Sequence, residues 1–166
     1  MNKVIFLDRD GVVNVERGEY TWRVEDFELT VGLIDFLSYF KNKDCLVIII
    51  SNQGCIGKGI CTQEDVEKAH NYLYNKLSKH ELSVAELYYC PHHPNSGKCL
   101  CRKPEPIMLE KAIARYDVDV KNSVFIGDSA RDSEAGKKVG LNTIQVKPND
   151  NLMEYCNRVE ELLKLV

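Results

Sequence analysis

The sequence predicts a fold of the α/β class, with a parallel sheet and helices on both of its faces. Short apolar runs alternate along the chain with longer segments whose apolar residues recur at helical spacing. Clusters of polar residues follow three of these runs directly, at the place where parallel sheets bind ligands. With 166 residues, 44% of them hydrophobic, the chain is expected to form one domain, residues 1–166, around its own core.

Five strands are expected, each a short and mostly apolar run that ends at polar residues. They are Val4–Leu7, Leu46–Ile50, Glu86–Tyr89, Ser123–Ile126 and Thr143–Val146. The second reads LVIII, an unbroken apolar run that is typical of a strand buried on both faces.

Five helices are expected between and after these strands. They are Val31–Phe40, Glu64–Leu77, Pro106–Tyr116, Arg131–Val139 and Asn151–Leu163. Thr62 is a suitable N-cap for the second helix, and the prolines at 104 and 106 suit the start of the third. Gly140 ends the fourth helix. The regular alternation of strand and helix predicts a Rossmann-like parallel sheet.

Composition restricts the partners. The net charge of -3 gives no basic footprint for nucleic acid, so none is expected as a partner. The N-terminus MNKVIFLDRD lacks the apolar core of a signal peptide, and no apolar run approaches the roughly 20 residues of a membrane helix. We therefore expect a cytoplasmic protein, a monomer that does not act at a membrane.

The first polar cluster contains two aspartates. Asp8 and Asp10 flank Arg9 directly after the first strand, and residues two apart on an extended segment point the same way. Two such carboxylates repel each other unless a cation lies between them, and a divalent ion with oxygen ligands is the natural partner. Gly11 allows the backbone to turn away sharply. The alternative is an Asp-rich surface turn.

The other clusters add the remaining parts of a phosphate site. Asp128 follows the fourth strand and could supply a third carboxylate to a magnesium ion, with Asp132 four residues on. The alternative is a helix N-terminus with acidic caps, which Asp132 can serve at the same time. Ser51 offers a hydroxyl and a backbone N–H at the end of the second strand. Lys103, beside Arg102 and just before a helix, favours a phosphoryl group.

The four clusters FLDRDGV, IISNQG, RKP and IGDSARD together resemble the four motifs of the haloacid dehalogenase superfamily, in the family's order. The resemblance implies that Asp8 attacks phosphorus and that Asp10 acts as general acid and base. It implies that Ser51 and Lys103 hold the phosphoryl oxygens. Magnesium would be held by Asp8, the backbone carbonyl of Asp10 and Asp128, with Asp132 as support. Members that cleave carbon–halogen bonds lack the second aspartate, so Asp10 favours phosphoryl transfer.

A second metal is expected in a loop. Cys90, His92, Cys99 and Cys101 provide three thiolates and one imidazole, a common ligand set of structural zinc. Clustered cysteines in a reducing compartment indicate a metal before disulfides. Redox cysteines or chance enrichment are the alternatives, and His93 is an alternative ligand.

The loop CPHHPNSGKCLCRKP resembles the zinc loop of the D-glycero-D-manno-heptose 1,7-bisphosphate phosphatases and of the related histidinol-phosphate phosphatases. The resemblance implies that His92 is the ligand rather than His93, and that zinc is structural and brings Arg102 and Lys103 to the site. Between Gly11 and the second strand there is room for a loop and one helix, so no large cap domain is expected. Specificity is then expected to depend on three loops: Val13–Trp22, Asn52–Gly59 and the zinc loop.

The first of these loops, with Glu16, Arg17, Gly18 and Glu19 at the matching positions, resembles the substrate-contacting segment of the heptose enzymes. Asn52, Gln53 and Gly54 are expected to bind substrate as well. The short gap between His92 and Cys99 is closer to the histidinol-type loop. The first loop implies a phosphatase that removes the C7 phosphate of a heptose bisphosphate. Arg102, brought in by the zinc loop, is expected to grip the distal anionic group, and Arg17 could add a second contact. The alternative is that Glu16 and Glu19, rather than the arginines, face the site.

Two alternatives remain at this point. The first is a histidinol-phosphate phosphatase. The second is a zinc-stabilised binding module without activity, against which the intact site residues argue.

Overall fold

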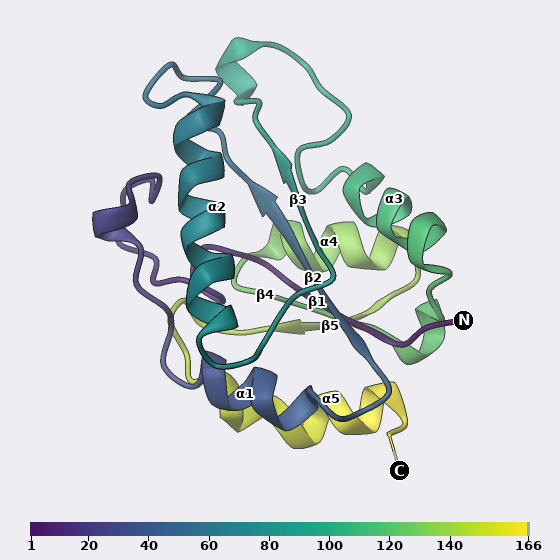
Figure 1. Ribbon diagram of the computed structural model, residues 1–166. Coiled ribbons are helices and arrows are strands. Elements are labelled where there is room, and N and C mark those ends of the chain that lie inside the picture. Colours follow the sequence, from purple (N-terminus) through teal and green to yellow (C-terminus); the bar gives the residue numbers. More distant parts are fainter. Residues whose placement is uncertain (166) are drawn as a thin grey trace.

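A five-stranded parallel sheet in the order β3-β2-β1-β4-β5 runs through the centre of the computed structural model, which describes residues 1–165 (Figure 1). The strands are β1 (Val4–Leu7), β2 (Leu46–Asn52), β3 (Glu86–Cys90), β4 (Val124–Gly127) and β5 (Asn142–Gln145). The predicted α/β class and the parallel sheet are confirmed. β2 is longer than expected, because its last residues, Ser51 and Asn52, pair with Tyr89 and Cys90 of β3.

The helices lie where helical spacing placed them. They are α1 (Leu33–Phe40), α2 (Gln63–Ser78), α3 (Ile107–Tyr116), α4 (Ala130–Lys138) and α5 (Cys156–Leu163). Thr62 caps α2 as expected, in a reciprocal pair of hydrogen bonds with Asp65. The C-terminal segment differs from the prediction, because it begins with a short 3-10 turn, Leu152–Tyr155, before α5.

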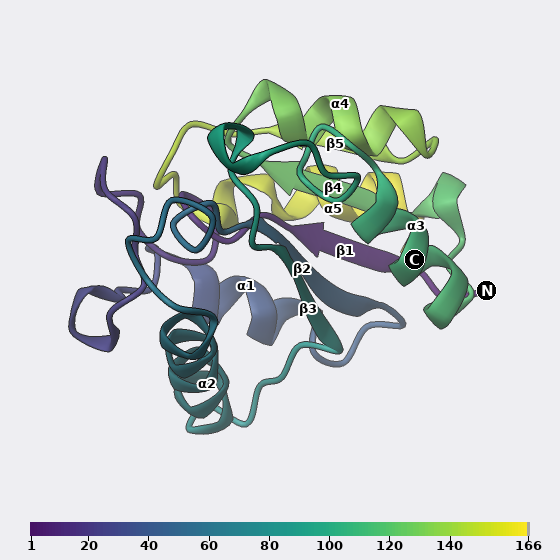
Figure 2. The ribbon, with the colours of Figure 1, turned by 90° about the horizontal axis from the view of Figure 1, so that it is seen from above.

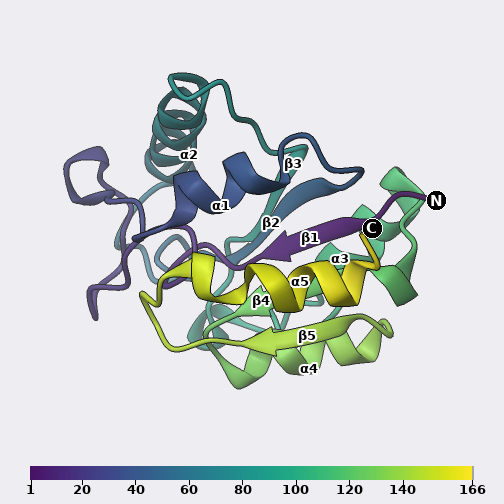
Figure 3. The same ribbon diagram turned by 90° about the horizontal axis from the view of Figure 1, so that it is seen from below.

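Strand β1 divides the core into two layers. Ile5 and Leu7 face one layer, where they pack with residues of α1, α2 and α5. Val4 and Phe6 face the other layer, with residues of α3 and α4. Figure 2 shows α1 and α2 on the opposite side of β1 from α4, and α1 lies beside α5 in Figures 1 and 3. Helices therefore cover both faces, as predicted.

The carboxyl ends of the strands meet at one edge of the sheet. Pairing is parallel between β1 and both of its neighbours, so that the segments after β1, β2 and β4 leave the sheet on the same side. Between β1 and β2 the chain forms one short 3-10 turn, Val24–Asp26, and the helix α1, and it forms no large cap. Within residues 1–165, no helix combines the length and the apolar character that a membrane span requires.

Candidate active site

The ammonium group of Lys103 is the centre of the candidate site. Lys103 is almost completely buried, and its Nζ lies 2.7 Å from Asp8 Oδ1, 2.7 Å from Asp132 Oδ1 and 2.9 Å from the carbonyl oxygen of Ile50. A buried ammonium is stable only when such partners satisfy it. These contacts connect the segments after β1 and β4, the strand β2 and the loop before α3. The structure therefore brings together Asp8, Lys103 and Asp132, as the sequence predicted.

Asn52 positions the backbone of Lys103. Its Oδ1 accepts a hydrogen bond from the Lys103 N–H at 3.0 Å, and its Nδ2 donates to the Lys103 carbonyl at 3.2 Å. Ser51 and Gln53 lie beneath the cavity surface, and both are buried. Gln53 Nε2 donates to Ser51 Oγ at 2.8 Å and to Asp10 Oδ2 at 2.9 Å. Gln53 thus links the second polar cluster to the first.

Asp10 is held from behind by a buried arginine that the sequence analysis did not assign. Arg9 is fully buried, and its Nη2 donates to Asp10 Oδ1 at 2.8 Å and to the Thr21 carbonyl. Its Nη1 lies 3.1 Å from Nε2 of His70, a residue of α2. Burial and the charge of Arg9 lower the pKa of His70 to about 3, so the ring is neutral and accepts this hydrogen bond.

The two aspartates differ in their pKa. Burial alone would raise the pKa of Asp10, but the charge of Arg9 and the hydrogen bonds from Arg9, Asn14 and Gln53 outweigh it and lower this pKa. For Asp8, burial raises the pKa well above its ordinary range. Lys103 opposes this rise, while Asp132 and Asp128 add to it. An ionised Asp8 therefore needs more positive charge than Lys103 supplies, which a divalent cation would provide.

The acidic cluster fits such a cation. Asp8, Asp128 and Asp132 each offer a carboxylate oxygen, and these atoms all lie within 4.8 Å of one another. Asp132 is already engaged, since it also accepts hydrogen bonds from the Ser129 N–H and hydroxyl at the start of α4. Both oxygens of Asp132 therefore have partners, whereas Lys103 and the Arg9 N–H both contact Oδ1 of Asp8 and leave its Oδ2 available. Asp8 and Asp128 are thus the better placed ligands, and the supporting role of Asp132 stays a prediction.

Gly11 makes room for Asp128. A Cβ atom at Gly11 would lie 2.0 Å from Asp128 Oδ2, and the φ of Gly11 is +86°, a conformation that favours glycine. The predicted sharp turn after Asp10 is present. It brings the backbone of the first cluster against the carboxylate of the fourth.

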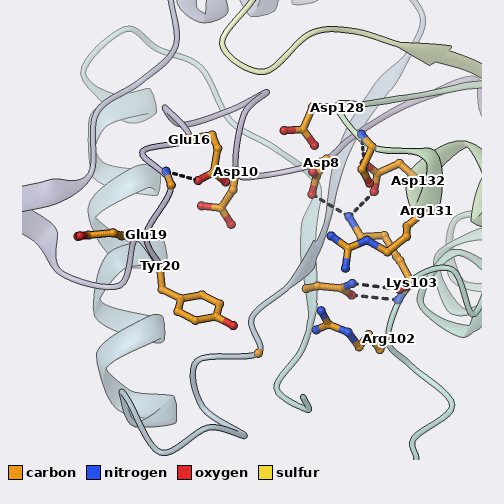
Figure 4. A pocket seen from close by; sticks show the side chains of 14 residues that line it. Asp8, Asp10, Glu16, Glu19, Tyr20, Arg102, Lys103, Asp128, Arg131 and Asp132 are labelled. Atoms are coloured by element: carbon orange, nitrogen blue, oxygen red, sulfur yellow. Dashed lines mark hydrogen bonds and ion pairs between the residues drawn. The ribbon is translucent and has the colours of Figure 1, made fainter. Parts of the chain in front are cut away.

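A cavity of about 530 Å³ opens above these groups (Figure 4). Its lining includes most of the predicted residues, namely Asp8, Asp10, Glu16, Gly18, Glu19, Asn52, Gly54, Arg102, Lys103, Asp128 and Asp132. Glu16, Glu19 and Tyr20 stand on one side, while Arg102, Lys103 and Arg131 stand on the other. Asp8, Asp128 and Asp132 lie near Lys103 on the second side. We call the side with Glu16 and Glu19 the acidic side and the side with Arg102 and Arg131 the basic side.

Arg17 does not join this lining. Its Nη1 lies 3.2 Å from Asp26 and its Nη2 lies 3.8 Å from Glu19, so its charge is directed toward neighbouring acids. The expectation that Arg17 faces a far phosphate therefore has no support in this arrangement. The cavity instead contains Arg131 and Tyr20, which the sequence analysis did not single out. Arg131 comes from a fourth segment, the start of α4, whereas three specificity loops were expected.

The cysteine-rich loop brings four potential zinc ligands together. Cys90 Sγ lies 3.4 Å from His92 Nδ1, 3.7 Å from Cys99 Sγ and 2.9 Å from Cys101 Sγ. Thiolates about 2.3 Å from a tetrahedral zinc ion would be roughly 3.7 Å apart, so the cluster is close to the size that zinc requires. His93 points elsewhere, because its Nδ1 accepts a hydrogen bond from the Asn95 N–H. The geometry favours His92 over His93.

Comparison with known proteins agrees with this site. A family model described as HAD-hydrolase-like matches residues 100–158, the part of the chain that contains Lys103, Asp128 and Asp132. The fold and the site define a hydrolase of the haloacid dehalogenase type.

Similar proteins of known activity identify a narrower group within these hydrolases. The D-glycero-alpha-D-manno-heptose-1,7-bisphosphate 7-phosphatase of Campylobacter jejuni is 37% identical over 165 residues, which cover 96% of this chain and 94% of the relative. The enzyme of the same name from Photorhabdus laumondii is 36% identical over 145 residues, covering 84% and 79%. A solved structure of the D,D-heptose 1,7-bisphosphate phosphatase of B. bronchiseptica, complexed with magnesium and phosphate, superposes with a TM-score of 0.83. It is 28% identical and covers 93% of this chain and 86% of that one. The chain belongs to the heptose-1,7-bisphosphate 7-phosphatase family of the haloacid dehalogenase-like hydrolases.

The approach of Gly11 to Asp128 generates a prediction. Gly11→Ala should push the Asp128 carboxylate away and raise the magnesium concentration needed for half-maximal activity by about tenfold or more, the effect expected when a metal ligand is disturbed. Gly59→Ala is the matched control, because Gly59 has a φ of +71° and nothing within 4 Å of an added Cβ. Equal magnesium dependence of the two variants would contradict the proposed contact.

Proposed function

We propose that this protein removes the C7 phosphate of D-glycero-D-manno-heptose 1,7-bisphosphate through a phosphorylated Asp8. The observation that carries the reaction class is the 2.7 Å contact between Lys103 Nζ and Asp8 Oδ1, on the floor of a cavity that Asp10 and Asp128 also line. The substrate follows from the names of the relatives, which favour heptose bisphosphate over histidinol phosphate.

In the first step, an Asp8 oxygen attacks phosphorus and the bond from phosphorus to the C7 oxygen breaks. Asp10 donates its proton to that oxygen, which leaves as the sugar hydroxyl. Lys103 stabilises the charge on the phosphoryl oxygens, together with Ser51. Because the arginine behind Asp10 favours the carboxylate form, Asp10 must take up its proton once the substrate phosphate adds negative charge to the cavity.

In the second step, the carboxylate of Asp10 takes a proton from a water molecule, whose oxygen attacks phosphorus. The bond between Asp8 and phosphorus breaks, so that inorganic phosphate leaves and Asp8 is restored. Magnesium held by Asp8, the Asp10 carbonyl and Asp128 would supply positive charge beside the phosphoryl oxygens. Gln53 and Arg9 hold the Asp10 carboxylate in one position through both steps.

The substrate is held by side chains around the cavity. Asn52, the last residue of β2, and Gly54 line one part of the cavity above the buried Gln53, and Glu16, Gly18 and Glu19 form the opposite side. Carboxylates on that side suit sugar hydroxyl groups, which can donate hydrogen bonds to them. Arg102 is anchored by its Nη1, which donates to the His92 carbonyl at 3.2 Å, and its other nitrogens can meet an anionic group.

The zinc loop has a structural role in this proposal. Zinc bound by Cys90, His92, Cys99 and Cys101 would fix the loop immediately before Arg102 and Lys103. None of the seven cysteines, all of them within residues 1–165, forms a disulfide, which suits a compartment that keeps thiols reduced, and we propose the cytoplasm. We further propose that residues 1–166 form a single domain that acts as a monomer.

Replacing either aspartate should abolish turnover. Asp8→Asn removes the attacking oxygen, and Asp10→Asn removes the proton donor, whose loss alone costs roughly 10²- to 10⁴-fold in rate. The measurement is phosphate release by protein with an unchanged circular dichroism spectrum. Asp35→Asn, the same change at an exposed site on α1, should keep full activity. Release of phosphate at a near-wild-type rate by folded Asp8→Asn protein would refute the nucleophile.

Removal of zinc should affect the loop before the core. Cys99→Ser should eliminate bound zinc, weaken substrate binding and make the loop after β3 sensitive to protease, while most of the far-UV signal remains. Cys45→Ser, a change at a half-buried cysteine outside the cluster, is the control. Metal analysis of carefully purified wild-type protein should find one zinc per chain, and a protein without zinc that keeps full activity would rule out this role.

The substrate is tested by comparing kcat/KM for D-glycero-D-manno-heptose 1,7-bisphosphate and for histidinol phosphate. We expect the heptose bisphosphate to be preferred, and Arg102→Ala to lower the value for the bisphosphate by roughly 10- to 100-fold, the range for a lost hydrogen bond to a charged group. A higher value for histidinol phosphate that Arg102→Ala leaves unchanged would exclude the heptose substrate and leave the phosphatase reaction standing.

A further inference from the structure

We propose that Arg131, at the start of α4, binds the second phosphate of the substrate together with Arg102. This inference rests on the proposed function, because it requires a substrate with two phosphates. It identifies Arg131 as a specificity-determining residue, from a segment outside the loops that the sequence analysis assigned to specificity.

Arg131 has a free charge inside the cavity. Its side chain lines the cavity, and Figure 4 shows its guanidinium group on the same side as Arg102 and Lys103. Across residues 1–165, the structure records neither an ion pair nor a side-chain hydrogen bond for Arg131. Arg9 and Arg17, by contrast, lie against Asp10 and Asp26. Arg131 is thus available for an anionic ligand.

The backbone of Arg131 is fixed by the catalytic site itself. Ser129 and Asp132 form the reciprocal cap that begins α4, and Asp132 is also the partner of Lys103. Gly127 allows this arrangement, since a Cβ there would lie 2.3 Å from Asp132. The side chain of Asp132 therefore turns down to Lys103, while the neighbouring Arg131 is exposed to the cavity. The backbone at Arg131 therefore needs no ordering when a ligand binds, and the planar guanidinium group loses less freedom for each hydrogen bond than a lysine would.

The charges of the cavity allow one place for a second phosphate. The first phosphate lies at Asp8 and Lys103. On the opposite side, Glu16 and Glu19 would repel another phosphate, and Arg17 is directed to Asp26. The basic side offers Arg102 and Arg131, whose planar guanidinium groups can each bind phosphate through two hydrogen bonds. The second phosphate is therefore expected between these arginines, with the sugar hydroxyl groups toward Glu16 and Glu19.

The test compares two substrates that differ by this phosphate alone, D-glycero-D-manno-heptose 1,7-bisphosphate and D-glycero-D-manno-heptose 7-phosphate. Arg131→Ala should raise KM for the bisphosphate by roughly 10- to 100-fold, while kcat stays within about twofold and the constants for the monophosphate do not change. Arg131→Lys should restore part of the loss, because it keeps the charge without the planar fork. Lys137→Ala, on the same helix but outside the cavity, should match wild type.

The outcomes separate this inference from the proposed function. If the wild type prefers the bisphosphate and Arg131→Ala keeps that preference, the role of Arg131 is wrong and the proposed function stands. An equal rise of KM for both substrates would also overturn it, because it would indicate a general disturbance of the site. If the wild type itself does not distinguish the two substrates, the bisphosphate substrate and the role of Arg131 fail together.

Discussion

The buried ammonium group of Lys103 is the contact on which the site depends. It compensates two carboxylates, Asp8 and Asp132, that would otherwise repel each other beneath the same cavity. Strand β2 fixes the position of Lys103. The ammonium group donates a hydrogen bond to the Ile50 carbonyl, and the side chain of Asn52 accepts one from the Lys103 backbone N–H. Because Lys103 lies two residues after Cys101, the cysteine-rich loop determines where the Lys103 ammonium group lies at the edge of the sheet. Asp8, the acidic cluster and the cysteine-rich loop are thus parts of one electrostatic unit.

The site treats its first two aspartates in opposite ways. Asp8 lies among other carboxylates, so that its ionised form depends on cations from elsewhere in the fold. Asp10 pairs with its own cation, the fully buried Arg9, which in turn donates a hydrogen bond to His70 of α2. Both pKa directions oppose the proposed roles, since attack needs an ionised Asp8 and proton donation needs a protonated Asp10. A divalent cation beside Asp8 and a substrate phosphate beside Asp10 would each shift the balance toward the form that the reaction requires. Two residues that are nearly adjacent in sequence acquire distinct chemistry because different parts of the fold surround them.

The cavity lacks a large cap, so its selectivity must come from side chains on the edge of the sheet. Acidic groups from the loop after β1 face basic groups from the cysteine-rich loop and from α4. For the proposed substrate, this division would favour one orientation, with hydroxyl groups toward one side and phosphates toward the other. An open site of this kind can change its substrate by changing a few loop residues while the catalytic unit remains intact.

Local sequence by itself determined the secondary-structure elements and which polar groups lie together at the sheet edge. The spacing of apolar residues and the turn residues predicted the strands and helices. The motifs DRDG, SNQG and GDSARD each follow a strand, which predicted that Asp8, Ser51 and Asp128 would lie close together. These signals are local, and the topology of a parallel sheet brings them to one edge. The tertiary structure decided which charged side chains pair with one another. Arg9 turned inward to Asp10, Arg17 turned to Asp26, and Arg131 remained facing the cavity. Such choices depend on neighbours from distant segments and on burial, which no short pattern in the sequence records.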